Sequence, residues 1–233
     1  MQSSSNPAFF KPVASWRHFG IVIAIMLVVA VQGIVLQSKQ SVSRASSNHI
    51  VIYVSLIIVE WALVYLVWRG IRKTNTTLRD LVGGRWESPR DVVRDFALGI
   101  LLWVVLISIA TAWKYAAGGG GLSESVTAAL PRSGAERMLW VLVSISAGFA
   151  EEIVFRGYVQ RQLEALTRSR WTALGLQALL FGVTHGYQGA DAMVRISVLG
   201  LAFGLMAVWR RSLRPGIIAH SWTDMASGLF FMR

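Results

Sequence analysis

The sequence predicts an all-α, polytopic integral membrane protein, a helical bundle of about seven transmembrane helices. The first observation is composition: the 233-residue chain is 54% hydrophobic and only 15% charged, whereas a soluble domain carries roughly 25% charged residues. The second is that its apolar residues gather in runs, and a spanning helix needs about 20 mainly apolar residues. Helices are expected because an open strand edge leaves backbone groups unsatisfied in lipid.

Seven apolar runs follow one another along the chain. The predicted spans are Phe19–Leu36, Ile50–Trp68, Val92–Trp113, Glu136–Phe155, Trp171–Tyr187, Ala192–Trp209 and Gly216–Met232. No obvious small-residue cleavage site follows the first run, so we expect a retained transmembrane helix and not a cleaved signal peptide. The fifth and seventh runs are short and rich in polar residues, which leaves their ends less sharply defined.

The net charge of +11 reflects membrane topology better than nucleic-acid binding, because the basic residues lie between apolar runs and not on one soluble face. With the N-terminus inside, most of the 23 Lys and Arg residues fall in inner segments. The positive-inside rule therefore predicts a cytoplasmic N-terminus. The chain contains no cysteine, which excludes disulfides, thiolate metal sites and cysteine nucleophiles.

The two halves of the chain differ in their polar content. Residues 1–134 hold three spans with few polar residues, and we expect them to form a membrane scaffold with a cytoplasmic basic loop. Residues 135–233 hold the other four spans and are predicted to form a second helical region, which carries most of the ionisable residues inside apolar runs. The glycine-rich loop from Lys114 to Ser133 is predicted to be flexible and to lie on the outer face.

Small and aromatic residues give two further predictions. Gly200 and Gly204 form a small-xxx-small pair, so another helix is expected to pack closely on the sixth span. Tryptophans near predicted helix ends are expected at the headgroup level: Trp68, Trp113, Trp140, Trp171 and Trp209.

Ionisable residues inside apolar spans are the most informative feature, because they are costly in lipid and by default mark a functional site. Three C-terminal stretches carry six of them: Glu151, Glu152, Arg156, His185, His220 and Asp224. Glu60, near the middle of the second span, is a further embedded acid to which the sequence assigns no role.

Helical spacing pairs these side chains. Glu152 and Arg156 are four residues apart and can form an ion pair on one helix face, and His220 and Asp224 share the same spacing. Glu151 is turned by about 100° from Glu152 and can face another partner. A carboxylate base, two imidazoles and an auxiliary acid suffice to activate a water and stabilise an oxyanion. Taken singly, each group could instead be a neutralised pair, a packing histidine or a polar clamp, and only their joint occurrence favours catalysis.

Three motifs occur in order: Glu-Glu-x-x-x-Arg, then Phe-x-x-x-His, then His-x-x-x-Asn/Asp. They resemble the CAAX-protease and bacteriocin-processing (CPBP, or Abi) family of intramembrane endopeptidases, and are similar to its type II CAAX prenyl endopeptidases. The resemblance covers roughly residues 135–230 and rests on seven positions: Glu151, Glu152, Arg156, Phe181, His185, His220 and Asp224.

The resemblance implies a role for each motif residue. Glu151 with His185 would activate the attacking water, and His220 with the residue at 224 would bind the oxyanion. Glu152 with Arg156 would hold the surroundings of the first glutamate. The family was long described as metalloproteases and is now better described as glutamate-type.

The residue at 224 departs from the family pattern, because the prenyl endopeptidases usually carry asparagine there. An ionised aspartate cannot donate a hydrogen bond to an oxyanion, so either Asp224 is protonated or it orients His220. The carboxylate also makes His185, His220 and Asp224 an alternative zinc set. We expect no cofactor and no obligatory zinc.

Ideal straight spans would place Glu151 and His185 at different depths in the membrane, on the order of 15 Å apart at 1.5 Å per residue. At that distance the two side chains could not act together. The helix-like stretch from Gly157 to Leu166 favours a fourth helix that continues past Arg156 to about Leu166. A displaced fifth span is the alternative.

The sequence thus predicts an intramembrane endopeptidase of a bacterial inner (plasma) membrane. Its expected partners are the lipid bilayer and a membrane-associated protein or peptide substrate, with no nucleic acid. The alternative is a non-catalytic membrane scaffold or bacteriocin-immunity-like protein of the same fold. A transporter is disfavoured because repeated halves with broken helices are not evident. The sequence names neither the substrate nor its prenylation.

Overall fold

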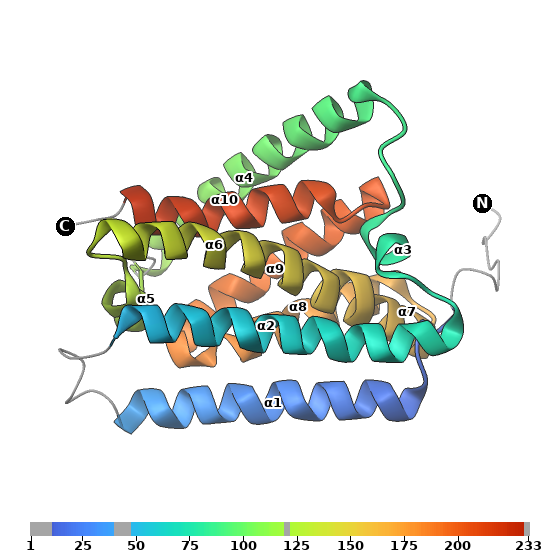
Figure 1. Cartoon of the computed structure of the whole chain (residues 1–233), viewed down its shortest axis with the longest axis horizontal. Helices are drawn as coiled ribbons and strands as arrows, with labels where there is room; N and C mark the ends of the chain where they lie inside the picture. The colour runs from blue at the N-terminus through green and yellow to red at the C-terminus, as the bar shows by residue number, and fades with distance from the viewer. Residues whose placement is uncertain (1–10, 40–47, 119–121, 231–233) are drawn as a thin grey trace.

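The computed structural model describes residues 11–39, 48–118 and 122–230, and within these ranges it contains helices and loops but no strand (Figure 1). Each predicted span corresponds to one long helix: α1 Trp16–Lys39, α2 His49–Ile71, α4 Pro89–Ala117, α6 Gly134–Glu151, α8 Arg170–Thr184, α9 Ala190–Arg210 and α10 Arg214–Phe230. The all-helical class is therefore confirmed. The end of the seventh predicted span, after Phe230, lies outside the described residues.

Shorter helical elements join the long ones. They are η4 Arg72–Thr74, α3 Leu78–Val82, α5 Glu124–Ala129, η5 Glu152–Val159, α7 Gln160–Thr167 and η6 Gly186–Gln188. Because α5 is a helix with an N-cap hydrogen bond from the Val126 amide to Ser123 Oγ, the expectation of a flexible loop was wrong for this stretch. Gly119 to Gly121 lie outside the described residues.

Two of the long helices begin at capping boxes. Ser88 and Asp91 cap α4, with Pro89 in its first turn, and Ser133 and Glu136 cap α6. In each box the serine accepts from one backbone amide and the acid accepts from another, which satisfies donors that a helix start leaves unpaired. The sequence thus fixes where each of these helices begins.

The fourth span is one continuous helix from Gly134 to Thr167, built from α6, η5 and α7. It runs past Arg156, as expected, and so Glu151 and His185 can lie at the same depth. Its middle part, η5, is a π-helix in which the Gln160 amide donates to the Phe155 carbonyl, five residues back. Such wide turns are rare and occur frequently at functional sites.

The C-terminal helices pack tightly on one another. α6 packs against α10 and α2, and α8 packs against α9. A Cβ atom on Gly200 would lie 3.3 Å from Ala178 Cα, and one on Gly204 would collide with the end of Leu174. The close helix neighbour expected at this glycine pair is therefore α8.

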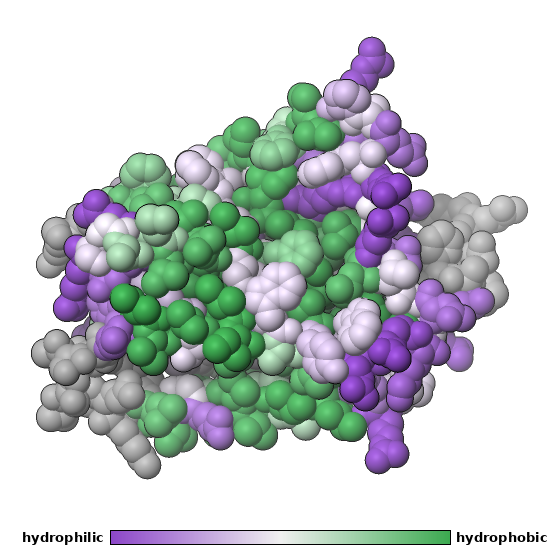
Figure 2. Space-filling view, viewed as in Figure 1, coloured by the Kyte–Doolittle hydropathy of each residue, from purple (hydrophilic) through white to green (hydrophobic). Residues whose placement is uncertain are grey.

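The described helices present an apolar surface. Five stretches are long and apolar enough to cross a membrane: Trp16–Leu36, His49–Thr74, Pro89–Ala116, Gly134–Thr167 and Ala190–Arg210. α8 and α10, with 15 and 17 residues, are shorter. Val28, Ile58 and Ile100 are 56%, 63% and 60% exposed, and Figure 2 shows apolar residues across the middle of the molecule with hydrophilic ones toward its ends. A surface of this kind requires a lipid environment, so the chain is an integral membrane protein.

Candidate active site

Glu152, the first residue of η5, and Arg156, one turn later, form the predicted ion pair. Arg156 Nη1 lies 2.9 Å from Glu152 Oε1, and both side chains are fully buried. The guanidinium also lies over the Phe181 and Phe203 rings, 4.2 and 5.0 Å from their centroids. A buried charge needs such compensation, because removal from water is expensive.

His220 on α10 binds the same carboxylate oxygen of Glu152 as Arg156 does. Its Nδ1 lies 3.1 Å from Glu152 Oε1, so an Nδ1–H group donates to that carboxylate. Its Nε2 then points to two other acids, 3.7 Å from Glu151 Oε2 and 3.6 Å from Asp224 Oδ2. Arg156 and Glu152 together fix the orientation of this imidazole ring.

His185 caps the C-terminus of α8. Its Nδ1 lies 2.7 Å from the Phe181 carbonyl, and because a carbonyl only accepts hydrogen bonds, Nδ1 carries the proton. Nε2 faces Glu151 Oε2 at 4.0 Å. The Tyr187 ring stacks on the imidazole with a centroid separation of 6.1 Å. A neutral His185 therefore presents an unprotonated nitrogen to Glu151.

Glu151, His185, His220 and Asp224 thus converge, as the motif analysis predicted, although they come from three helices. They line a cavity of about 370 Å³. Glu151 Oε2 is buried and has no hydrogen-bond partner within the described part of the chain. Its separations of 3.7 and 4.0 Å from the imidazoles exceed direct hydrogen-bond lengths and leave room for a bridging water.

A smaller cavity of about 180 Å³ adjoins the first and shares Glu60, Glu151 and His185 with it. Its other lining residues are mostly apolar side chains of α1, α2 and η5, among them Met26 and Phe155. The cavity therefore connects the acid and histidine cluster with the part of the bundle formed by α1 and α2.

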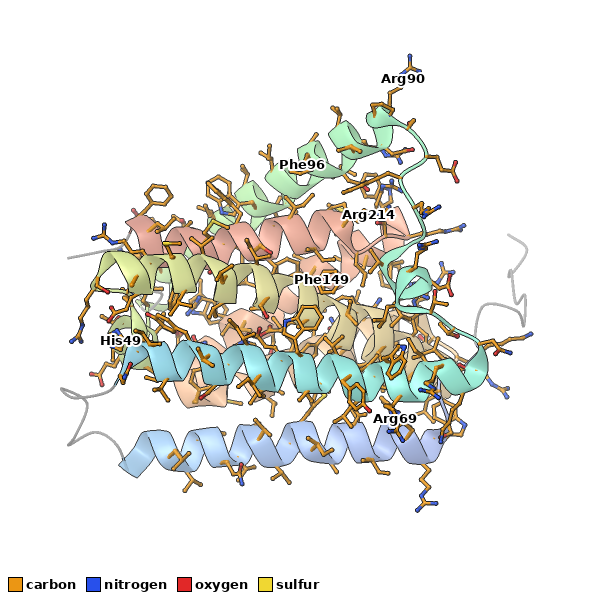
Figure 3. The ribbon with its side chains drawn as sticks, in the orientation of Figure 1. His49, Arg69, Arg90, Phe96, Phe149 and Arg214 are labelled. Carbon is orange, nitrogen blue, oxygen red and sulfur yellow. The ribbon has the colours of Figure 1, made fainter. Side chains whose placement is uncertain are left out.

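Glu60 lines both cavities, and sequence reasoning had left it without a role. Its Oε2 accepts from Ser146 Oγ at 2.5 Å, and Ser146 Oγ in turn accepts from Trp61 Nε1 at 3.0 Å. Trp61 stacks on Phe149, which lies on α6 (Figure 3). The position of an acid in the middle of an apolar span was the only sequence signal for Glu60.

Trp140, for which a headgroup depth was predicted, faces the interior of the protein and not lipid. It is only 9% exposed, it lines the larger cavity, and its Nε1 donates to the Asp224 carbonyl at 2.9 Å. The ring also packs on Tyr53, 5.6 Å away between centroids. Proximity to a helix end did not reveal that α2 and α10 cover this indole. Trp209, by contrast, is 69% exposed.

The alternative zinc set is not assembled in this arrangement. Within residues 11–39, 48–118 and 122–230, no three His, Asp or Glu side chains are placed so that they could hold one metal ion. His185 and His220 direct their Nδ1 atoms to a carbonyl and to Glu152. Both Nε2 atoms remain directed at Glu151, but Asp224 does not converge with them on one metal position.

The fold and the site define a polytopic helical membrane protein with a glutamate and histidine centre inside its bundle. Residues 134–226 match the family described as type II CAAX prenyl endopeptidase, Rce1-like, which confirms the resemblance to the CPBP family and indicates a CAAX-protease type of intramembrane endopeptidase. No curated protein and no solved structure matches the chain. The matched region contains all six candidate residues: Glu151, Glu152, Arg156, His185, His220 and Asp224.

Proposed function

We propose that the chain is an intramembrane endopeptidase that hydrolyses a peptide bond of a membrane-associated protein or peptide with a water activated by Glu151. The observation that carries the proposal is the unpartnered Glu151 carboxylate, which faces both His185 and His220 inside one cavity. A carboxylate and two imidazoles around one water can supply the base and the oxyanion donor that amide hydrolysis needs.

In the first step the water oxygen attacks the carbonyl carbon and its proton passes to Glu151. His185 supports this transfer, because its unprotonated Nε2 faces the same carboxylate. The product is a tetrahedral intermediate that carries one negative charge on oxygen. Glu151 then returns the proton to the leaving nitrogen, the carbon–nitrogen bond breaks, and a carboxyl group and an amine are released.

His220 is the proposed oxyanion donor. Glu152 accepts from Nδ1, so a His220 ring that carries both protons presents Nε2–H to the developing charge. Asp224 lies 3.6 Å from that nitrogen, and we assign it the role of orienting the ring, because an ionised carboxylate cannot itself donate. Glu152 and Arg156 are positioning residues behind His220.

The substrate would reach this centre from within the bilayer. The smaller cavity offers apolar walls next to Glu151, which suit an apolar segment of a membrane-associated peptide, and the larger one offers Trp140 and Tyr53. This favours a substrate whose cleaved bond lies beside apolar residues.

The test is a Glu151→Gln variant of the full chain, compared with wild type by the termini of membrane proteins in cells and by peptide cleavage in vesicles. Loss of a general base is expected to lower the rate by about 10²–10⁴-fold. The matched control is Glu87→Gln, because Glu87 is exposed and remote from both cavities.

The alternative is a non-catalytic scaffold or immunity-like protein, and the same variant distinguishes it. A scaffold would keep its cellular phenotype after Glu151→Gln, because the substitution changes one charge and almost no volume. A well-folded, normally abundant Glu151→Gln protein that leaves every terminus unchanged and retains the phenotype would refute the endopeptidase.

A further inference from the structure

A third cavity, of about 340 Å³, shares no lining residue with the two cavities described above. Its walls come from the segment before α1, from η5 and α7, from the start of α8 and from the end of α9. Five of its lining residues are cationic and one is acidic: Lys11, Arg156, Arg161, Arg170, Arg211 and Glu164. The cavity contains none of the proposed reacting groups, so the endopeptidase mechanism does not explain it.

The cavity contains two buried polar atoms without a partner in the described residues. One is Arg156 Nε, a donor on a side chain that is fully buried, and the other is Gln160 Oε1, an acceptor on a residue that is 3% exposed. Buried polar atoms that lack a partner cost free energy. A ligand for this site therefore needs an acceptor for the guanidinium and a hydroxyl donor for the amide.

The surrounding charges specify the acceptor. Guanidinium groups recognise phosphate oxygens with planar, charge-assisted hydrogen bonds, and several cations around one concavity favour a ligand that spreads its negative charge over several oxygens. Glu164 opposes an anion, but it accepts from Gln160 Nε2 at 3.4 Å and lies within electrostatic reach of Arg161 and Arg170. The cationic lining residues outnumber it.

The fold holds the cavity wall in place. Buried Gln162 on α7 binds the segment before α1, since its Oε1 accepts from the amides of Val13 and Ala14 and its Nε2 donates to the Ala14 carbonyl. This hydrogen bonding brings Lys11 to the cavity. Exposed Trp171 and Trp209, next to lining residues of α8 and α9, are 73% and 69% exposed, which fits a depth near lipid headgroups.

We propose that this cavity binds a phosphate group that also carries, or adjoins, a hydroxyl. Phosphate oxygens accept from Arg156 Nε and the neighbouring cations, and the hydroxyl donates to Gln160 Oε1. Two sources share this chemistry: the headgroup of a phospholipid such as phosphatidylglycerol, and free hydrogen phosphate. The occupied site supports Arg156 from its free side and so stabilises the arrangement of Glu152 and His220.

The experiment measures the melting temperature and binding isotherm of the purified full chain with inorganic phosphate in detergent. A second arm measures melting and retained lipid, by native mass spectrometry, in nanodiscs of phosphatidylglycerol or phosphatidylcholine. A ligand that binds the folded state raises the melting temperature. Phosphatidylglycerol retained with little response to inorganic phosphate identifies a lipid headgroup, and the reverse identifies a soluble phosphate.

The decisive comparison uses two variants with the same loss of charge. Lys11→Gln/Arg170→Gln alters the cavity wall and is expected to weaken binding at least about tenfold, which corresponds to about 1.4 kcal/mol. Arg79→Gln/Arg90→Gln removes two exposed cations that do not line the cavity, and Arg90 lies in the first turn of α4 (Figure 3); this control should bind like wild type.

Equal weakening in both variants would mean non-specific attraction, and no binding of either probe would mean no site, so either result overturns the proposal. All binding arms can be repeated with Glu151→Gln protein. Their outcome is thus independent of whether the chain is a peptidase.

Discussion

The three N-terminal helices and the long helix of residues 134–167 differ in how much of their surface the protein covers. In the most apolar window of α1, α2 and α4, 22%, 17% and 17% of the residues are buried, whereas the window in the helix from Gly134 to Thr167 is 56% buried. The first three helices each contact the rest of the bundle along a narrow face and expose apolar side chains elsewhere. The long fourth helix is surrounded by α2, α8 and α10.

This difference explains where polar groups can be placed. A charged side chain in hydrocarbon is costly, and η5 carries Glu152 and Arg156 with both side chains fully buried. Packing of α1 and α2 over the smaller cavity separates Glu151 from lipid. Packing of N-terminal helices against the C-terminal region thus shields its ionisable groups from lipid. The division of the chain near residue 134 stays a prediction.

The largest expected effect of a stability variant follows from this contrast. Arg156→Ala removes the guanidinium that pairs with buried Glu152 and leaves His220 as its remaining partner, and breaking a buried ion pair typically costs about 3–5 kcal/mol. Arg69→Ala makes the same change in the N-terminal region, where the side chain is exposed (Figure 3) and donates a hydrogen bond of 3.4 Å to Tyr65. It should lower the free energy of unfolding by less than about 1 kcal/mol. Unfolding in mixed micelles and the yield of folded protein measure both.

A double variant separates loss of the pair from loss of packing. Glu152→Gln/Arg156→Met removes both charges and keeps most of the volume, so it should recover part of the stability that Arg156→Ala loses. Arg156→Ala protein with wild-type stability would contradict the burial of this pair. The difference in burial between the two regions would then have no measurable effect on stability.

The sequence predicted much of the fold because hydrophobic run length and helix start signals are local. The seven long helices, the continuation of the fourth one past Arg156 and the presence of a close helix neighbour at Gly200 and Gly204 all follow from such patterns, although only five of the helices are long and apolar enough to span a membrane. The π-helix of η5 did not, since no local signal in Glu152–Val159 distinguishes i→i+5 from i→i+4 hydrogen bonding. α5 was missed because a six-residue helix has too short an apolar pattern to recognise.

A smaller loss of stability is expected when alanine replaces a glycine at a close contact between two helices. A Cβ atom on Gly148 in α6 would lie 2.7 Å from the Ser221 amide nitrogen and 3.0 Å from its Cα, so the backbone of α10 must shift. Overpacking of this kind costs about 1–3 kcal/mol, and Gly148→Ala should lower stability by that amount. Because α10 carries His220, peptidase activity should fall with it.

The matched control is Gly20→Ala in α1, where nothing lies within 4 Å of the added Cβ atom. There the substitution should leave stability unchanged or raise it by about 0.5–1 kcal/mol, because alanine favours helix more than glycine does. Thermal unfolding of the two variants is sufficient. Equal effects would show that α1 packs as closely as α6, contrary to the comparison above.

The candidate site was predictable in membership and not in geometry. Glu151, His185 and His220 could be selected because ionisable groups in apolar spans are rare, but their orientation depends on contacts far apart in sequence. The Phe181 carbonyl fixes the tautomer of His185, and Glu152 fixes the ring of His220. The burial of Trp140 could not be predicted for the same reason, since only tertiary packing brings Asp224 to its indole.

The smallest expected effect is that of metal removal, which tests what holds the C-terminal polar cluster together. We expect peptidase activity of protein stripped with a strong chelator to equal that of untreated protein, because Glu151 can take the proton from water without help.

The cluster is already cross-connected by protein contacts: Arg156 to Glu152, Glu152 to His220, and His185 to a backbone carbonyl. A zinc ion bound through the two Nε2 atoms could keep these contacts, but a catalytic zinc also needs a third converging protein ligand and an open position for water, and within the described residues no three such side chains are grouped. The measurement pairs cleavage rates with elemental analysis of the same samples, and the Glu151→Gln protein provides the background rate. Activity that disappears on stripping and returns with stoichiometric zinc would recast Glu151 as a base acting on a metal-bound water, and would mean that His185, His220 and Asp224 adopt an arrangement different from the one described above.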